Sequence, residues 1–188
     1  MVKFICIEGI SYTGKTTLFE NLGRQGFYKA NRIALGYDKD YRAIKKDNNF
    51  KAKFDFFKEE LKSRSNDYLK IDESFIADRY FLSIIAHYSI YLKQDVISTD
   101  LDFFNSLIQP DLTLLLTANM DTIKKRDKKR IENNFELLNE IQDRFLRVAS
   151  NFSNIQIIKT DELSIEEVFI KAMKIISNST QILNEQIL

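Results

Sequence analysis

The sequence predicts an α/β fold of three layers, in which a five-stranded parallel sheet lies between helices on both faces. Short apolar runs typical of buried parallel strands alternate along the chain with longer stretches whose apolar residues recur at helical spacing. Strands that alternate with helices form a parallel sheet through right-handed crossovers. A glycine-containing loop also follows the first apolar run, and folds of this class bind ligands at the carboxyl ends of their strands.

The expected strands follow from the apolar runs in chain order. The fourth run, LTLLL, is the clearest, and Gly36 is expected to close the second strand. The strands are expected at 3–7, near 32–35, at 74–77, at 112–116 and at 155–158.

The helices are expected where apolar side chains fall on one face. The first follows the glycine-containing loop, and a helix at 101–108 is ended by Pro110, which cannot continue it. Ser164 and Glu167 form the pattern of a capping box, which opens the last helix. The other helices are expected at 54–62, 81–92, 123–130 and 135–149.

The composition favours one domain in a reducing compartment. A chain of 188 residues that is 44% hydrophobic buries a full core, and no repeat or linker divides it, so we expect a single domain over 1–188. The formal net charge of +1 excludes a global field that would recruit nucleic acid or an acidic membrane. Cys6, the only cysteine, is expected in the core and cannot form an internal disulfide. Because neither a signal peptide nor a membrane span is expected, the predicted location is cytoplasmic.

The segment from Gly9 to Thr16, GISYTGKT, fits the pattern G-x-x-x-x-G-K-[ST] of the phosphate-binding loop of P-loop NTPases. It lies between a predicted strand and a predicted helix, the context in which backbone N–H groups and a helix N-terminus converge on a phosphate. Lys15, expected to be exposed on the loop, would bind the β- and γ-phosphates of ATP, and the Thr16 hydroxyl would ligate Mg²⁺. The residues expected to bind ATP are Gly9, Ile10, Ser11, Tyr12, Thr13, Gly14, Lys15, Thr16 and Thr17.

A carboxylate and a guanidinium group follow the third predicted strand, in Asp78-Arg79-Tyr80. At this strand end Asp78 would face the phosphate loop and hold Mg²⁺ through water, while Arg79 would neutralise a phosphoryl group during transfer. The alternative is a salt-bridged pair at a strand end. Glu8, at the end of the first strand, would either reach the metal or Arg79 or make structural hydrogen bonds. His87, the only histidine, is assigned no role.

The stretch DTIKKRDKKR, at 121–130, is strongly basic and predicts a lid segment near 120–135. Arg126 and Arg130 are four residues apart, so they share one helix face. Phosphoryl transfer needs cations around the migrating group, and a mobile basic segment supplies them. A solvated helix face is the alternative.

Several of these segments resemble the thymidylate kinase family, a group of P-loop kinases whose members transfer phosphate from ATP to dTMP. The residues ICIEG at 5–9 and GKTT at 14–17 are similar to the family's opening. Asp78-Arg79-Tyr80 with Ser83 and Ala86 resembles its DRY-x-x-S-x-x-A signature. The residues PDLT at 110–113 resemble its entry into the fourth strand.

The resemblance implies ATP and Mg²⁺ as cofactors, a nucleotide acceptor, and catalytic roles for Lys15, Arg79, Arg126 and Arg130. It implies that Arg79 and Ser83 contact the acceptor, and that Phe54 stacks on its base with Lys58 as the basic partner. Without the resemblance Phe54 is read as a core residue, because Phe57 and Leu61 share its stripe. The family also implies a homodimer built from helices packed side by side, for which the helix at 81–92 is a candidate. Nucleic acid and membranes are not expected partners.

The chain departs from the family on the acceptor side. Ser11 stands where the family usually has an acidic residue, Tyr12 where some members have arginine, and the Pro-containing motif after the second strand is missing. Two alternatives therefore stay open. The deoxynucleoside kinases share the fold and use a carboxylate after the second strand as a general base, a part that Asp38 or Asp40 would play. A nucleotide-binding regulatory protein without an acceptor site is the other.

Overall fold

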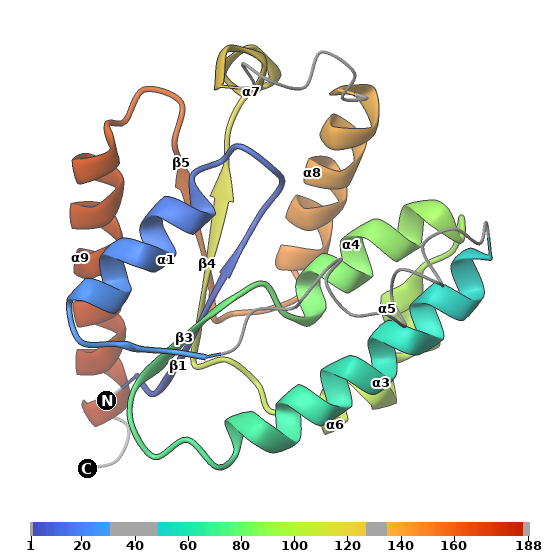
Figure 1. Cartoon of the computed structure of the whole chain (residues 1–188), viewed down its shortest axis with the longest axis horizontal. Coiled ribbons are helices and arrows are strands. Elements are labelled where there is room, and N and C mark those ends of the chain that lie inside the picture. Colours follow the sequence, from blue (N-terminus) through green and yellow to red (C-terminus); the bar gives the residue numbers. More distant parts are fainter. Residues whose placement is uncertain (1, 31–48, 127–134, 186–188) are drawn as a thin grey trace.

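The computed structural model describes residues 2–30, 49–126 and 135–185. Its five strands are β1 (Phe4–Glu8), β2 (Tyr28–Lys29), β3 (Phe75–Asp78), β4 (Leu112–Thr117) and β5 (Ile155–Lys159). All are parallel and pair in the order β2-β3-β1-β4-β5 (Figure 1). The predicted fold class is confirmed. The strand that pairs with β3 ends at Lys29, and the strand expected near 32–35 lies outside the described residues.

The helices agree with the predicted ones in order, with differences in length. They are α1 (Lys15–Arg24), α3 (Phe50–Tyr68), α4 (Phe81–Tyr91), α5 (Val96–Thr99), α6 (Leu101–Ser106), α7 (Met120–Arg126), α8 (Phe135–Ala149) and α9 (Ile165–Glu185). The helix α3 is longer than the predicted 54–62 at both ends. It starts earlier because the side chain of Asn49 caps it by accepting the N–H of Ala52, and it continues to Tyr68. The short helix α5 was not predicted. The basic helix starts at Met120, and its predicted part beyond Arg126 lies outside the described residues.

Alternating side chains of the strands build two separate cores. Phe4 and Cys6 of β1 pack into the core that contains α3, α4 and α8, whereas Ile5 and Ile7 pack into the core that contains α1 and α9. Figure 1 shows α1 and α9 on one side of the sheet and α3, α4 and α8 on the other. A strand that buries both of its faces needs the continuous apolar run seen at its position. The buried Cys6 is the core residue that was predicted, and burial raises the pKa of its thiol.

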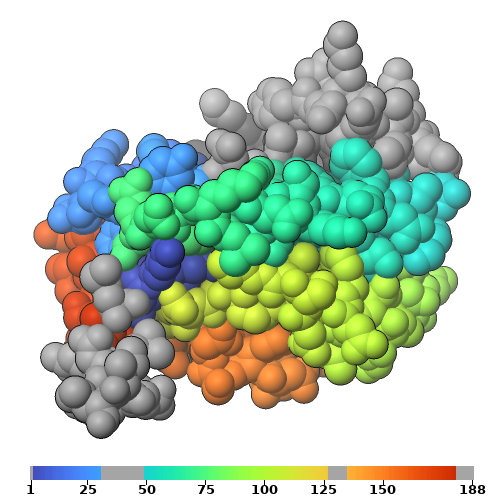
Figure 2. Space-filling view, turned by 90° about the horizontal axis from the view of Figure 1, so that it is seen from below, coloured from blue at the N-terminus to red at the C-terminus, as the bar shows by residue number. Residues whose placement is uncertain are grey.

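The helix α3 lies against the segment that holds α5 and α6, as the turquoise and yellow-green surfaces of Figure 2 show. The backbone N–H of Ile108 donates to the Ser65 hydroxyl at 2.8 Å, and the ammonium group of Lys58 contacts Asp100 at 2.8 Å. Two polar contacts therefore fix α3 along this segment.

The helix α4 is enclosed within the chain. It packs against α3 and α8, and none of its 11 residues is exposed. The dimer contact for which it was a candidate stays a prediction. None of the helices in the described ranges has the length and apolar character needed to cross a bilayer.

The predicted capping box forms at the start of α9. The N–H of Ser164 donates to the Glu167 carboxylate at 2.7 Å, and the N–H of Glu167 donates to the Ser164 hydroxyl at 3.2 Å. Two N–H groups that a helix start leaves without backbone partners are thus satisfied.

We expect Ser164→Ala to lower the free energy of unfolding by about 1 kcal/mol, the usual loss when a serine cap is removed. Ser177, an exposed serine inside α9, provides the control, because Ser177→Ala removes no cap. Denaturant unfolding of both variants measures the difference. Equal stability of the two variants would show that the box does not stabilise α9.

Candidate active site

The phosphate loop joins β1 to α1 through backbone conformations that need glycine. Gly9 has φ 132°, and a Cβ atom there would overlap the carbonyl oxygen of Leu116 on β4. Gly14 has φ 96° and is the N-cap of α1. Since Gly14 has no side chain to cap the helix, the first N–H groups of α1 are left for an anion.

Two side chains of the loop hold the same carbonyl oxygen. The hydroxyl of Thr13 donates to the carbonyl of Ile10 at 2.9 Å, and the ammonium group of Lys15 donates to it as well. Lys15 is only 5% exposed, so the expectation that it lies exposed on the loop is wrong. The cause is the turn from Gly14 into α1, which brings the ammonium group back inside the loop.

The remaining loop residues divide between the outside and the core. Ser11, Thr16 and Thr17 are exposed, whereas the side chain of Ile10 packs into the core. The exposed hydroxyl of Thr16 lies on the first turn of α1, at the end of the helix where phosphates bind.

The end of β3 lies next to the strand that leads into the loop. Asp78 pairs with Ile7 in the parallel register and is almost completely buried. The next residue, Arg79, has φ 70°, and its N–H donates to the carbonyl of Ile7 at 3.0 Å. The structure therefore brings Asp78 and Arg79 beside the phosphate loop, as the strand order requires.

Glu8 joins β1 to the start of α4. Its wholly buried carboxylate accepts hydrogen bonds from the N–H of Tyr80 at 2.8 Å, from the N–H of Ser83 at 3.2 Å, and from the Ser83 hydroxyl. The guanidinium group of Arg79 in turn donates to the Ser83 hydroxyl at 3.1 Å. Burial raises the pKa of Glu8, and the Ser83 hydrogen bond and the charge of Arg79 oppose that shift. Of the roles considered for Glu8, the structure shows hydrogen bonding.

His87 lies one turn along α4 from this network. Its Nδ1 lies 2.7 Å from the carbonyl of Ser83, so the ring carries its proton on Nδ1 and donates it there. Burial first, and then the positive charges of Arg79 and Lys15, lower the pKa of His87 to about 4. His87 is therefore neutral near pH 7 and adds no charge beside Arg79.

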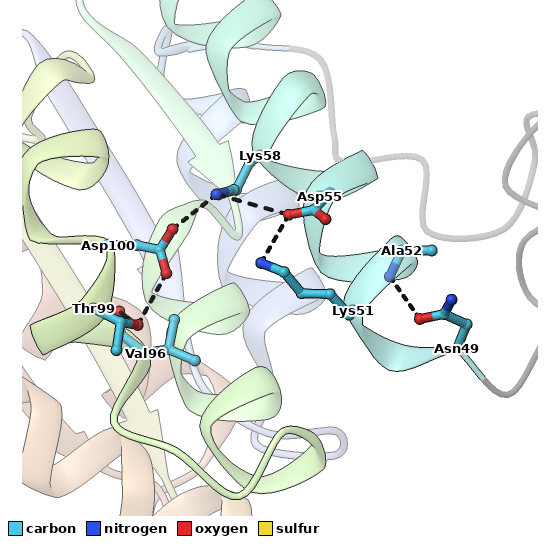
Figure 3. Close-up of polar contacts among 8 residues, drawn as sticks. All are labelled: Asn49, Lys51, Ala52, Asp55, Lys58, Val96, Thr99 and Asp100. Atoms are coloured by element: carbon cyan, nitrogen blue, oxygen red, sulfur yellow. Dashed lines mark hydrogen bonds and ion pairs between the residues drawn. The ribbon is translucent and has the colours of Figure 1, made fainter.

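The predicted base-binding residues lie on α3, where the ring of Phe54 is fully buried in the core. The ammonium groups of Lys51 and Lys58 lie 5.2 and 5.1 Å from the centre of this ring. Lys58 also forms ion pairs with Asp100 at 2.8 Å and Asp55 at 3.8 Å (Figure 3). Burial alone would raise the pKa of Asp100, but hydrogen bonds from Lys58 and Thr99 lower it. The Lys58 charge is thus already matched by carboxylates.

Arg126 is held by the phosphate loop and by the end of β5. Its guanidinium group donates to the carbonyl of Tyr12 at 3.2 Å, to the Thr160 hydroxyl at 3.0 Å and to the Thr160 carbonyl at 2.5 Å. Arg130, the other predicted lid arginine, lies outside the described residues.

Sequence reasoning missed Thr160, which directly follows β5 and is almost completely buried. No motif contains it. The rule that ligand sites collect at the carboxyl ends of parallel strands was not applied to β5, where it would have indicated Thr160.

Comparison with protein-family models and with curated proteins gives no match for this sequence. Its structure, however, is similar to solved kinase structures. Thymidylate kinase from Candida albicans has a TM-score of 0.78 at 18% sequence identity, over 95% of this chain and 92% of that chain. Deoxyadenosine kinase from M. mycoides, with the products dCMP and a flexible dCDP bound, has a TM-score of 0.70 at 19% identity, over 93% of this chain and 98% of that chain. Thymidylate kinase from Ehrlichia chaffeensis has a TM-score of 0.65 at 19% identity, over 94% of this chain and 98% of that chain.

The chain has the thymidylate kinase-like P-loop kinase fold. The fold implied by the resemblance of short segments is therefore confirmed. Sequence identities below 20% support no more than the fold, because unrelated functions share folds.

The lowered pKa of His87 makes the stability of this kinase fold depend on pH. An unfolded histidine titrates near 6.5 and the folded one near 4, so between these values the unfolded state binds more protons. Stability is therefore complete above about pH 6.5 and falls as the pH is lowered toward 4. We expect His87 to account for a loss of roughly 2–3 kcal/mol between about pH 7 and pH 4.5.

The control is His87→Gln, because a glutamine amide can donate a hydrogen bond as the imidazole does but does not titrate. Carboxylates titrate equally in both proteins, so the difference between the two pH profiles of denaturant unfolding isolates His87. Parallel profiles would contradict the lowered pKa.

Proposed function

We propose that this protein is an ATP-dependent nucleoside-monophosphate kinase of the thymidylate kinase type. It transfers the γ-phosphoryl group of Mg-ATP to dTMP or a similar deoxynucleotide. The observation that carries this proposal is the position of Arg79, which the network of Glu8 and Ser83 holds beside the phosphate loop.

The residues of the loop fit Mg-ATP. The glycine conformations, the uncapped start of α1 and the ammonium group of Lys15 are suited to the phosphates. Thr16 and Asp78 would hold Mg²⁺, which in proteins takes one or two side-chain ligands and completes its shell with water and phosphate oxygens. Bound Mg²⁺ would neutralise charge on the β- and γ-phosphates. The described residues hold no group of three or more His, Cys, Asp and Glu side chains that would suit a metal held by the protein alone.

Arg79 is better suited to an acceptor phosphate than Lys58. Within the described residues Arg79 forms no ion pair and donates to the Ser83 hydroxyl, so its charge is not neutralised by contact with a carboxylate. Lys58 would first have to leave Asp100. The acceptor phosphate is anionic at neutral pH and needs no general base, so the residues act by orienting it and by neutralising charge.

A nucleoside kinase is the second candidate, because deoxyadenosine kinase from M. mycoides shares the fold at a TM-score of 0.70. A nucleoside hydroxyl would need a general base, for which Asp38 and Asp40 are the candidates. Both lie outside the described residues. We favour the nucleotide acceptor, because the chain carries DRY-x-x-S-x-x-A at the end of β3 and lacks a clear carboxylate motif after the second strand.

Lys15→Ala should abolish phosphoryl transfer and weaken Mg-ATP binding at least about tenfold, because the loop loses its cation. Isothermal titration calorimetry with Mg-ATP measures the affinity, and Lys3→Ala, at an exposed lysine of the same strand region, is the control. The Lys15 variant should also be about 1 kcal/mol less stable, because a buried hydrogen bond to Ile10 is lost. Wild-type affinity in folded Lys15→Ala would exclude the role assigned to this residue.

The two kinase candidates are separated by a coupled assay of all nucleosides and monophosphates with ATP, followed by two sets of variants. Arg79→Gln removes the charge at a similar length and should cost roughly 2–4 kcal/mol in kcat/KM for the monophosphate. Asp38→Asn and Asp40→Asn should have little effect. If instead a nucleoside is the acceptor, one of these two changes should lower the rate about 10²- to 10⁴-fold.

Phosphorylation of thymidine but not of dTMP would overturn the nucleotide proposal. Binding of Mg-ATP without transfer to any acceptor would leave the regulatory protein as the explanation.

A further inference from the structure

The Thr160 side chain makes more polar contacts than its position after a strand requires. Its hydroxyl lies 3.2 Å from the carbonyl of Thr13 and 3.2 Å from that of Thr117, and it accepts a hydrogen bond from Arg126 at 3.0 Å. Its N–H donates to the Thr117 carbonyl at 2.9 Å, which extends the pairing of β4 with β5. Thr160 is thus fixed to the sheet and reaches from there to the phosphate loop.

Arg126 reaches the same loop one residue earlier. Its Nη1 donates both to the Tyr12 carbonyl and to the Thr160 hydroxyl, and its Nη2 donates to the Thr160 carbonyl. The two residues together therefore hold two successive carbonyls of the loop, those of Tyr12 and Thr13. We call Thr160 and Arg126 the carbonyl clamp.

Because the peptide bond is planar, a hydrogen bond that holds a carbonyl also sets the direction of the next N–H group. In a trans peptide the C=O and the following N–H point in opposite directions, and the described residues contain no cis peptide. A held carbonyl of Tyr12 turns the N–H of Thr13 away from Arg126, and a held carbonyl of Thr13 turns the N–H of Gly14 away from Thr160. The clamp thus sets the direction of two backbone donors of the loop.

The conformation of Tyr12 shows why such a clamp is needed. Tyr12 has φ 66°, a left-handed conformation that costs of order 1–3 kcal/mol for a residue other than glycine. Such a conformation persists where surrounding contacts determine it, and the hydrogen bond from Arg126 to the Tyr12 carbonyl is such a contact.

We propose that Thr160 is a positioning residue for nucleotide phosphates, acting with Arg126 through the carbonyls of Tyr12 and Thr13. The inference rests on the proposed function, because it assumes that the loop N–H groups bind the phosphates of ATP or ADP. In this arrangement Arg126 is an anchored part of the loop's support.

The test compares three threonine variants. Thr160→Val keeps the branched shape and loses the hydroxyl, Thr160→Ser keeps the hydroxyl, and Thr113→Val is the control at a buried threonine of β4. Calorimetry with Mg-ADP and Mg-ATP should show binding weakened about tenfold in Thr160→Val. Binding by Thr160→Ser and Thr113→Val should stay close to that of the wild type.

A second readout needs no nucleotide. In backbone-amide NMR spectra of the nucleotide-free protein, the signals of Thr13 and Gly14 should shift or broaden in Thr160→Val and stay in place in Thr113→Val. Arg126→Lys keeps the charge but loses the forked geometry, so it should move the Thr13 signal most. This variant also keeps the inference testable if Thr160→Val does not fold.

The outcomes separate the two proposals. If the wild type binds neither Mg-ATP nor Mg-ADP, the proposed function fails, while the amide signals still test the clamp. If the wild type binds and folded Thr160→Val binds equally well, with unmoved amide signals, the inference is overturned. A loss of thermal stability common to Thr160→Val and Thr113→Val, without a loss of affinity, would also overturn it, because it would reduce Thr160 to a structural residue.

Discussion

The parallel pairing of β1 with β3 on one side and with β4 on the other is the constraint on which the site depends. It places the ends of three strands side by side, so that Gly9, Asp78 and Leu116 are neighbours although they are far apart in the sequence. The loop approaches β4 so closely that only glycine fits at position 9. Further contacts tie these strand ends to their surroundings: Glu8 bonds the start of α4, and Thr160, after β5, bonds Thr117 and the phosphate loop.

The charges of the site are local, as a net charge of +1 requires. Arg79 and Arg126 donate to hydroxyl and carbonyl oxygens, and within the described residues neither forms an ion pair with a carboxylate. Neutral acceptors fix the direction of a guanidinium group and leave its positive charge for an anionic ligand. Lys58 shows the opposite arrangement, because Asp100 and Asp55 already match its charge.

The sequence predicted what depends on local pattern. The apolar runs predicted β1, β3, β4 and β5 within one or two residues, and Ser164 with Glu167 predicted the start of α9. The short helix α5 was missed, because four residues carry no helical period.

The sequence predicted the parts of the candidate site that a motif of neighbouring residues records. It missed the contacts that join residues far apart in the chain. Glycine positions and Asp78-Arg79 belong to such motifs. The burial of Lys15 and the contacts of Thr160 with Arg126 depend on tertiary structure, which no spacing along the chain records. The same limit applies to Phe54, whose stripe fitted both a core residue and a stacking ring.

Backbone strain is concentrated in the phosphate loop and at the end of β3. Three residues other than glycine have positive φ in the described chain: Tyr12, Arg79 and Lys93. Lys93 follows the end of α4, where the N–H of Gln94 donates to the Ser89 carbonyl, so it is an ordinary left-handed helix end. Tyr12 and Arg79 have no such explanation. Tyr12 lies in the loop after β1, and its carbonyl accepts a hydrogen bond from Arg126. Arg79 directly follows β3, and it donates its N–H to the Ile7 carbonyl of β1 and its guanidinium group to the Ser83 hydroxyl. Strain that is kept at two neighbouring strand ends, and supported there by buried polar groups, is typical of residues that are oriented for a ligand.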